Sequence, residues 1–312
     1  MTIFLWESKI CKKKSDSIFF ARGRGYNGGT VGRLYDMHDM KIVLYAAHKW
    51  MEDYMKSFYC EDEDVMFGIQ MKEKHTGYVT ANARQLALHL KLSEQEVDLA
   101  ELIGLLHDVG RFRQWQIYKT FVDAKSEDHA DLGVKVIREL PFYALLREEA
   151  RDLVVFAIAN HNKKEIAPAP DERHLLFAKI IRDADKLDIF RVLAPYLAAN
   201  PDAEGQSAVV QKFMKGPNGD ADGKVGVFAP GFLEKFVRGE QVDYTMIRTN
   251  EDRKLVRLMW VYDVNFAWTL ERIRDKGYID AIIANLPDSP LLRQGVERLQ
   301  RYVAEKCATP DV

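Results

Sequence analysis

Apolar residues recur every three or four positions along most of this chain, and this spacing restricts it to a helical fold. The pattern begins near residue 37 and returns, with Leu, Ile, Val or Ala, around residues 75–90, 128–139, 145–162 and 172–199. Strands have little room between these segments. We therefore predict an all-α protein. The apolar face of the first helix consists of Met40, Val43, Leu44, Ala47, Trp50, Met51 and Tyr54.

A capping pattern and a glycine mark the ends of one further predicted helix. Ser93 together with Glu96 is typical of a capping box at a helix N-terminus. Gly110 is typical of the residue that follows a helix C-terminus. On this interpretation, His107 and Asp108 lie in the last turn, so one helix end presents two polar side chains.

Glycine and proline divide the chain into three predicted parts. Residues 1–35 are glycine-rich and are predicted to form a short irregular arm, and residues 36–200 a helical domain. The glycines and prolines of residues 200–231 indicate a connection. Residues 201–312 are predicted to form a C-terminal helical extension packed on the first domain. Its long helical patterns cover residues 251–276 and 290–306.

Composition indicates a protein of the reducing cytoplasm. The 312 residues include 45 basic and 47 acidic side chains, and a net charge of -2 attracts neither nucleic acid nor an anionic membrane. The cysteines, Cys11, Cys60 and Cys307, are too dispersed for a disulfide framework or a zinc ribbon. No apolar run approaches the roughly 18 residues typical of a membrane span.

A set of histidines and aspartates lies in helical, apolar surroundings between residues 75 and 185. Imidazole nitrogen and carboxylate oxygen together suit Zn, Mn, Fe, Co or Ni, and separate helices can each contribute inward-pointing ligands. Asp128, Asp183 and Asp188 are instead interpreted as capping or solvated residues, because Asp is common near helix ends. The predicted metal ligands are His75, His107, Asp108, His129, His161 and Asp185.

Asp108 is predicted to bridge two cations, because a carboxylate has two oxygens. Two cations roughly 3.5–4 Å apart can activate a shared water and screen the charge of a phosphoryl group. The expected cofactor is therefore a pair of divalent transition-metal ions. The first coordination shell would be completed by His75, His107 and Asp185, and the second by His129 and His161.

The order of these residues resembles the H…HD…D signature of the HD-domain superfamily of metal-dependent phosphohydrolases. The resemblance covers about residues 36–200, with residues 107–112 and 183–188 similar to those of a bacterial subgroup. It implies a helical bundle, and its dinuclear branches, with further histidines like His129 and His161, include phosphodiesterases of cyclic nucleotides and cyclic dinucleotides. The sequence departs from the cyclic-dinucleotide branch, since Asn162 replaces a second histidine and no GYP-like tripeptide is present.

The resemblance implies an enzyme that hydrolyses a phosphoester of a nucleotide or small phosphorylated metabolite with metal-activated water. Asp108 would bridge the ions and is a candidate proton acceptor. Because an anionic substrate needs cations, Arg111 is predicted to bind phosphate oxygens, and Lys186 to bind substrate and supply charge to the leaving group. Neither nucleic acid nor a membrane is an expected partner, and an oligomer is compatible with the sequence.

Two alternative functions are retained. The same residue order also resembles HD-type diiron oxygenases such as myo-inositol oxygenase, which use iron and dioxygen. A noncatalytic module that senses a nucleotide or a metal is the other alternative. Iron-dependent oxygen consumption would favour the oxygenase, phosphate release without oxygen the hydrolase, and tight binding without turnover the sensor.

Overall fold

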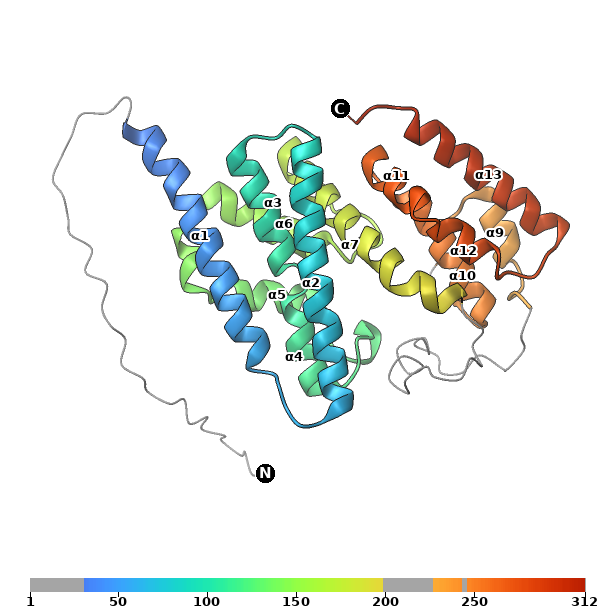
Figure 1. Ribbon diagram of the computed structural model, residues 1–312, viewed down its shortest axis with the longest axis horizontal. Coiled ribbons are helices and arrows are strands. Elements are labelled where there is room, and N and C mark those ends of the chain that lie inside the picture. Colours follow the sequence, from blue (N-terminus) through green and yellow to red (C-terminus); the bar gives the residue numbers. More distant parts are fainter. Residues whose placement is uncertain (1–30, 199–226, 243–245, 312) are drawn as a thin grey trace.

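The computed structural model describes residues 31–198, 227–242 and 246–311 (Figure 1). These residues form helices joined by loops and contain no strand, so the predicted all-α class is confirmed. Most of the predicted arm, residues 1–35, and most of the predicted connection, residues 200–231, lie outside the described residues. The proposed domain boundaries stay predictions.

The first bundle contains the helices of the N-terminal two thirds of the chain. They are α1 (Val31–Lys56), α2 (Glu63–His89), α3 (Glu94–Leu106), α4 (Val109–Tyr118), α5 (His129–Arg138), α6 (Glu148–Asn160) and α7 (Glu172–Ala198). Helix α2 packs against α3 and α7, while α4 packs against α5 and α6 against α7 (Figure 1). Helix α2 also packs against α4, so it is central to this bundle.

Helix α3 begins as predicted but ends earlier. Ser93 and Glu96 form the expected capping box. Gly110, predicted to follow the helix end, lies inside α4, so that prediction was wrong. A Cβ added to Gly110 would lie 2.2 Å from the carbonyl oxygen of His129 and 2.7 Å from the amide nitrogen of Gly133. The glycine therefore allows α4 to approach α5 closely, a packing role that local sequence does not reveal.

The C-terminal helices form a second group beside α7. They are α9 (Phe232–Arg238), α10 (Asn250–Met259), α11 (Ala267–Asp275), α12 (Tyr278–Ile283) and α13 (Pro290–Cys307). Helix α13 matches the predicted helix at residues 290–306. Both α11 and α12 pack against α7, so α7 joins the two groups (Figure 1).

The predicted continuous helix over residues 251–276 is interrupted, and a buried carboxylate explains the interruption. After the short helix η4 (Trp260–Asp263), the chain is not helical until α11. Asp183 of α7 accepts hydrogen bonds from the backbone amides of Asn265 and Phe266, both at 2.9 Å. These amides donate to the carboxylate of Asp183 and not to the carbonyls of a preceding helical turn. Asp183 is fully buried, which raises its pKa against the opposing effect of Lys186 and these bonds.

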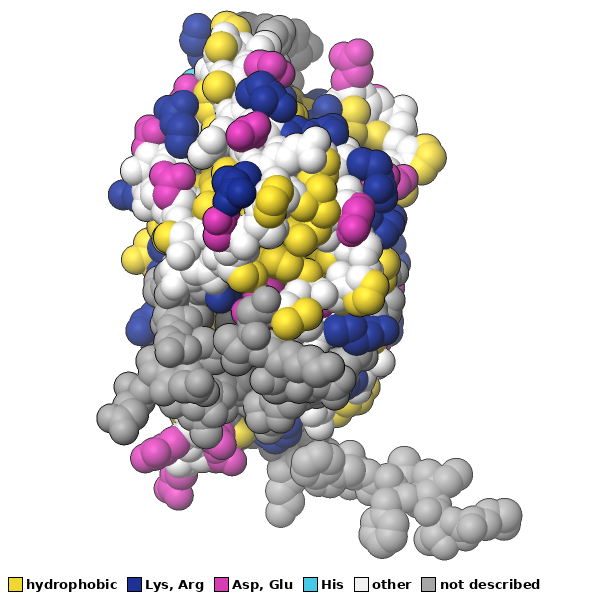
Figure 2. All heavy atoms as spheres, turned by 90° about the vertical axis from the view of Figure 1, so that its right-hand side faces the viewer, with side chains coloured by type: hydrophobic (Ala, Val, Ile, Leu, Met, Phe, Trp, Pro, Cys, Tyr) yellow, Lys and Arg dark blue, Asp and Glu magenta, His cyan; other side chains and the backbone are white. Residues whose placement is uncertain are grey.

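The surface on the side of the C-terminal helices carries side chains of both charge signs around a strip of hydrophobic ones (Figure 2). No single sign dominates the visible, described part of this face. Within the described ranges, no helix has both the length and the apolar character needed to cross a membrane.

Candidate metal centre

The predicted ligands come from separate parts of the first bundle and converge at its centre. His75 lies in the middle of α2 and Asp185 in the middle of α7, whereas the others lie at helix ends. His107 ends α3 and Asp108 precedes α4, so the junction of two helices supplies both. The remaining two, His129 and His161, lie at the start of α5 and the end of α6.

One oxygen of Asp108 faces the first predicted group of ligands. Its Oδ2 lies 3.4 Å from Nε2 of His75 and 3.6 Å from Nε2 of His107. The two Nε2 atoms are 3.3 Å apart. Oδ1 of Asp185 is 3.1 Å from Nε2 of His75 and 3.9 Å from Nε2 of His107. Two ligands each about 2.1 Å from one ion, in tetrahedral geometry, are roughly 3.4 Å apart, so these spacings suit a shared ion.

The other oxygen of Asp108 faces the second predicted group. Its Oδ1 lies 3.4 Å from Nε2 of His129 and 3.7 Å from Nε2 of His161. The two Nε2 atoms are 3.0 Å apart. The carboxylate of Asp108 therefore lies between two pairs of histidines, with one oxygen toward each pair. This is the arrangement that a bridging carboxylate requires.

Each histidine is oriented by an acceptor at its other ring nitrogen. Nδ1 of His75 donates to Asp188 at 2.6 Å, and Nδ1 of His129 donates to Asp123 at 2.7 Å. Nδ1 of His107 and of His161 donate to backbone carbonyls, those of Gly104 at 2.8 Å and Ile158 at 2.7 Å. A proton held at Nδ1 leaves Nε2 as the lone-pair nitrogen, which is how metal-binding histidines are fixed in proteins. The donor set therefore suits a transition metal.

Burial keeps two of these histidines neutral. It lowers the pKa of His107 to about 4 and that of His129 to about 3. Asp108 behaves oppositely to a simply buried carboxyl. Burial raises its pKa, but the charge of Lys72 and hydrogen bonds with His161 and His75 hold it well below the usual range. Neutral imidazole and ionised carboxylate are the protonation states that bind metals.

His75 differs because three carboxylates surround it. Burial and the charge of Lys72 lower its pKa, but hydrogen bonds with Asp108, Asp185 and Asp188 raise it to about 10. Without a metal, Nε2 of His75 therefore carries a proton near neutral pH. A metal ion bound there would replace this proton.

The predicted substrate cation Arg111 lies beside the cluster and is largely engaged. Its Nη1 donates to Asp123 at 2.8 Å, to the side chain of Gln114 at 2.7 Å and to the carbonyl of Phe121 at 2.7 Å. Its buried Nε lacks a hydrogen-bond partner and lies 3.6 Å from Oδ1 of Asp108. Arg111 thus supports Asp123, the partner of His129, and a phosphate-binding role stays a prediction.

Lys186 is directed away from the cluster. Its ammonium lies 2.8 Å from Oδ2 of Asp263 in η4, which also accepts from Arg182 at 2.8 Å. This ion-paired group joins α7 to the C-terminal helices. The geometry does not bring Lys186 to the predicted ligands, so we give it no part in the reaction proposed below.

Three residues that contact the predicted ligands were not identified from the sequence. Asp188, interpreted as a capping or solvated residue, is instead the acceptor for His75, whereas Asp128 does cap α5 through the amides of Ala130 and Asp131. Asp123 is the acceptor for His129. Lys72 donates to Oδ2 of Asp108 at 2.7 Å. Helical spacing carried a signal for two of them, since Lys72 is three residues before one ligand and Asp188 three residues after another.

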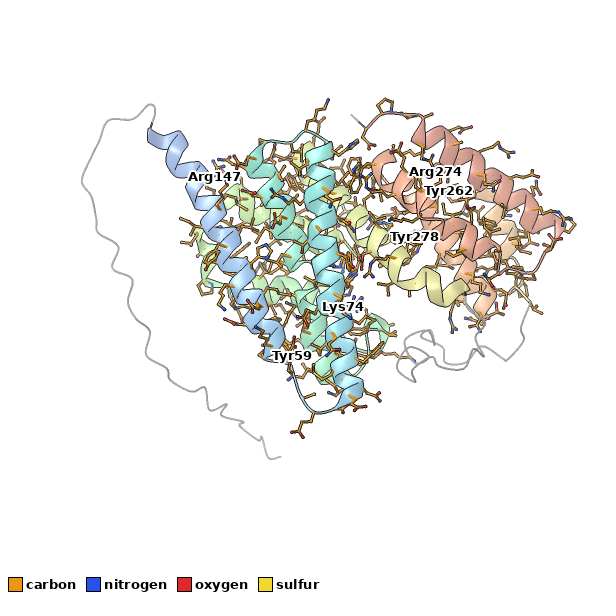
Figure 3. The ribbon with its side chains drawn as sticks, in the orientation of Figure 1. Tyr59, Lys74, Arg147, Tyr262, Arg274 and Tyr278 are labelled. Atoms are coloured by element: carbon orange, nitrogen blue, oxygen red, sulfur yellow. The ribbon has the colours of Figure 1, made fainter. Side chains whose placement is uncertain are left out.

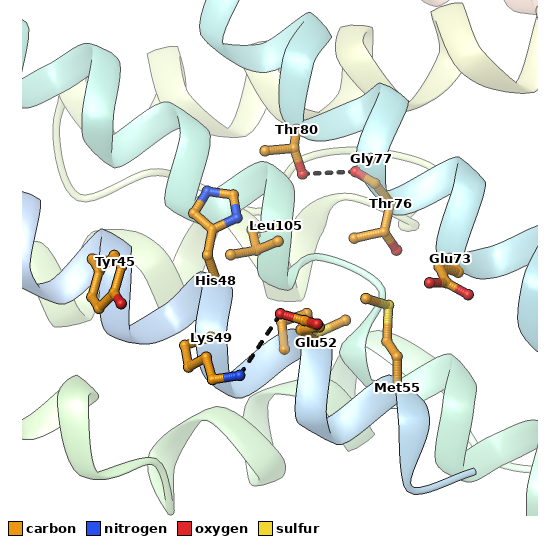
Figure 4. Close-up of a pocket in the computed structure, with 11 residues that line it drawn as sticks. Tyr45, His48, Lys49, Glu52, Met55, Glu73, Thr76, Gly77, Thr80 and Leu105 are labelled. Atoms are coloured by element: carbon orange, nitrogen blue, oxygen red, sulfur yellow. Dashed lines mark hydrogen bonds and ion pairs between the residues drawn. The ribbon is translucent and has the colours of Figure 1, made fainter. Parts of the chain in front are cut away.

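A cavity of about 510 Å³ lies beside α1 and α2, apart from this cluster (Figure 4). Its apolar wall includes Met51, Met55 and Leu105. Thr76 also lines it, but none of the predicted ligands does. The cavity is therefore distinct from the candidate metal centre.

Comparison with known protein families agrees with this geometry. A family model described as HD domain matches residues 73–189, a range that contains every predicted ligand from His75 to Asp185. The comparison with curated proteins found no match, and neither did the comparison with solved structures. Residues 73–189 therefore match the family that the order of the predicted ligands resembles.

Proposed function

We propose that this protein is a metal-dependent phosphohydrolase that cleaves a phosphoester of a nucleotide or another small phosphorylated metabolite. The observation that carries the proposal is the position of Asp108, whose two oxygens face different pairs of histidine Nε2 atoms. The match of residues 73–189 to the HD domain supports the same class of reaction.

Two divalent transition-metal ions are proposed as the cofactor. His75, His107 and Asp185 are close enough together to hold one ion. His129 and His161 would hold the other, and Asp108 would bridge the two. When bound, such ions supply a water of lowered pKa and screen the negative charge that develops on a phosphoryl group.

The surrounding residues are proposed to keep the ligands in place and in the right protonation state. Asp188 and Asp123 fix the rings of His75 and His129 through Nδ1. Asp108, whose pKa is held low, stays ionised near neutral pH and is a poor proton acceptor, so we assign it the bridging role alone. The outer carboxylates therefore act through the ligands and not on the substrate.

A small substrate is proposed because the cluster is buried. The side chain of Asp108 is 3% exposed and that of His107 0%, whereas that of Asp185 is 16% exposed. Solvent therefore reaches the cluster beside Asp185, which gives an ester group a place to enter. This restriction favours a small molecule over a phosphate within a folded macromolecule.

A panel of phosphomonoesters and phosphodiesters, assayed with Mn, Fe, Co, Ni and Mg, tests the proposal. Wild-type protein should release phosphate or cleave a diester without oxygen, and Asp108→Ala should abolish this activity. Asp64→Ala is the control, since Asp64 is exposed in the first turn of α2. Equal activity of Asp108→Ala and wild type would contradict the bridging role. Iron-dependent oxygen consumption without ester cleavage would instead favour the oxygenase.

A further inference from the structure

Lys72 places a cation at the centre of the ligand cluster. It lies one turn before His75 on α2, and its ammonium is 2.7 Å from Oδ2 of Asp108. The Lys72 side chain is 13% exposed, so it reaches the cluster from the solvent side. A charged hydrogen bond of this kind holds the carboxylate ionised.

The oxygen that Lys72 contacts is the same oxygen that faces one pair of histidines. Oδ2 of Asp108 lies 3.4 Å from Nε2 of His75 and 3.6 Å from Nε2 of His107. A metal ion held by these atoms would share Oδ2 of Asp108 with the ammonium of Lys72. Two cations would then contact one oxygen. Their repulsion, strong in a buried site, would move the ammonium, which is on a flexible four-carbon stem.

After such a movement, the ring of Phe121 would keep the ammonium of Lys72 beside the cluster. Its Nζ lies 5.5 Å from the ring centre of Phe121, within the range of a cation–π contact. That ring is itself stacked on Trp115 with centroids 4.4 Å apart, which fixes its position. The neighbouring cation Arg111 is held by Asp123, so it is less able to turn toward a substrate.

We propose that Lys72 binds the phosphate group of the substrate when a metal occupies the place beside Oδ2 of Asp108. In the metal-free protein the same ammonium is the counter-ion of that carboxylate. Lys72 would then add one direct charged contact to the phosphoryl oxygens. The inference rests on the proposed function, because it assumes an anionic phosphate at the cluster.

Inorganic phosphate is the probe, and its affinity for Mn²⁺-loaded protein is measured by calorimetry. Lys72→Met should weaken phosphate binding roughly tenfold or more, as expected for loss of one charged hydrogen bond, and Lys72→Arg should restore part of it. The matched control is Lys74→Met, because Lys74 is an exposed lysine on the same helix (Figure 3). Lys74→Met should bind phosphate like wild type.

The affinity for Mn²⁺ alone, measured on the same variants, separates substrate binding from site integrity. Lys72→Met should bind Mn²⁺ as tightly as wild type or more tightly, since a competing cation is removed. Weaker Mn²⁺ binding would assign Lys72 to the support of the site and overturn the inference. Phosphate binding no weaker than that of Lys74→Met would overturn it as well.

The outcome for Lys72 is distinguishable from that for the proposed function. If wild-type protein cleaves no phosphoester but Lys72→Met still weakens phosphate binding, the hydrolase proposal fails and the anion site stands. If wild type cleaves esters and Lys72→Met retains both its phosphate affinity and its KM, the hydrolase stands and Lys72 is not its phosphate ligand.

Discussion

Asp188→Asn should weaken metal binding although Asp188 is not a proposed ligand. The Asp188 carboxylate is fully buried and accepts from Nδ1 of His75 at 2.6 Å and from Nε of Arg191 at 2.6 Å. Asparagine preserves the size of the side chain but removes the charge, and it presents at most one acceptor oxygen to these two donors. The ring of His75 would lose the partner that orients Nε2 toward Asp108 and Asp185.

The magnitude follows from the role of such a partner. Loss of a carboxylate that orients a metal-binding histidine typically weakens metal affinity by about 10-fold to 100-fold. This range corresponds to about 1.4–2.8 kcal/mol in the free energy of Mn²⁺ binding. Because the Arg191 side chain is 36% exposed, solvent can accommodate its charge, and we expect the variant to fold.

Competition with a chromophoric chelator measures the Mn²⁺ affinity of Asp188→Asn. Asp280→Asn is the control, since Asp280 is an exposed aspartate in the first turn of α12. Circular dichroism of both variants checks that the helices are retained. A folded Asp188→Asn protein with wild-type Mn²⁺ affinity would refute the argument that Asp188 positions His75.

Three further predictions concern protons and packing. Metal binding should release a proton from His75, because its pKa is about 10 without metal. Calorimetric enthalpies of Mn²⁺ binding at about pH 8 should therefore vary with the ionisation enthalpy of the buffer. Identical enthalpies in different buffers would contradict this prediction. The metal-free protein should lose stability as the pH falls from about 6.5 toward 4, because the depressed pKa values of His107 and His129 mean that the unfolded chain takes up protons that the folded chain does not. Its free energy of unfolding in urea should fall by up to about 1.4 kcal/mol per pH unit for each of them, and a flat profile would exclude neutral buried histidines. Gly110→Ala should lower stability by roughly 1–3 kcal/mol and weaken Mn²⁺ binding, since its Cβ would meet the backbone of His129. Gly77→Ala, whose Cβ meets no atom within 4 Å, should do neither, and equal melting temperatures of the two variants would contradict the packing argument.

The sequence was informative where a residue's role follows from helical context and order. The apolar spacing predicted the long helices, and the capping box of Ser93 and Glu96 located the start of α3. The order of histidines and aspartates predicted which side chains meet, and the structure brings Asp108 between the two predicted groups. Helix positions and the cap follow from residues close together in sequence, and the ligand set follows from the order of its members along the chain.

The errors arose where tertiary contacts decide a residue's role. Gly110 resembled the residue that follows a helix C-terminus, but its lack of a side chain allows α4 to lie close to α5. Asp183 and Asp188 resembled caps, yet one receives the backbone of residues 265–266 and the other a histidine 113 positions away. Lys186 lay next to a ligand in sequence but pairs with Asp263. For Asp183 and Lys186, partners so distant in sequence leave no local signal, whereas Asp188 lies one helical turn after the ligand Asp185.

The most direct test of the two-metal centre is anomalous diffraction from crystals of the Mn²⁺-loaded protein. The account predicts two peaks, roughly 3.5–4 Å apart, with the carboxylate of Asp108 between them. One peak should lie near Nε2 of His75 and His107, and the other near Nε2 of His129 and His161. Peaks remote from these nitrogens, or a single fully occupied peak that Asp108 does not contact, would contradict the account.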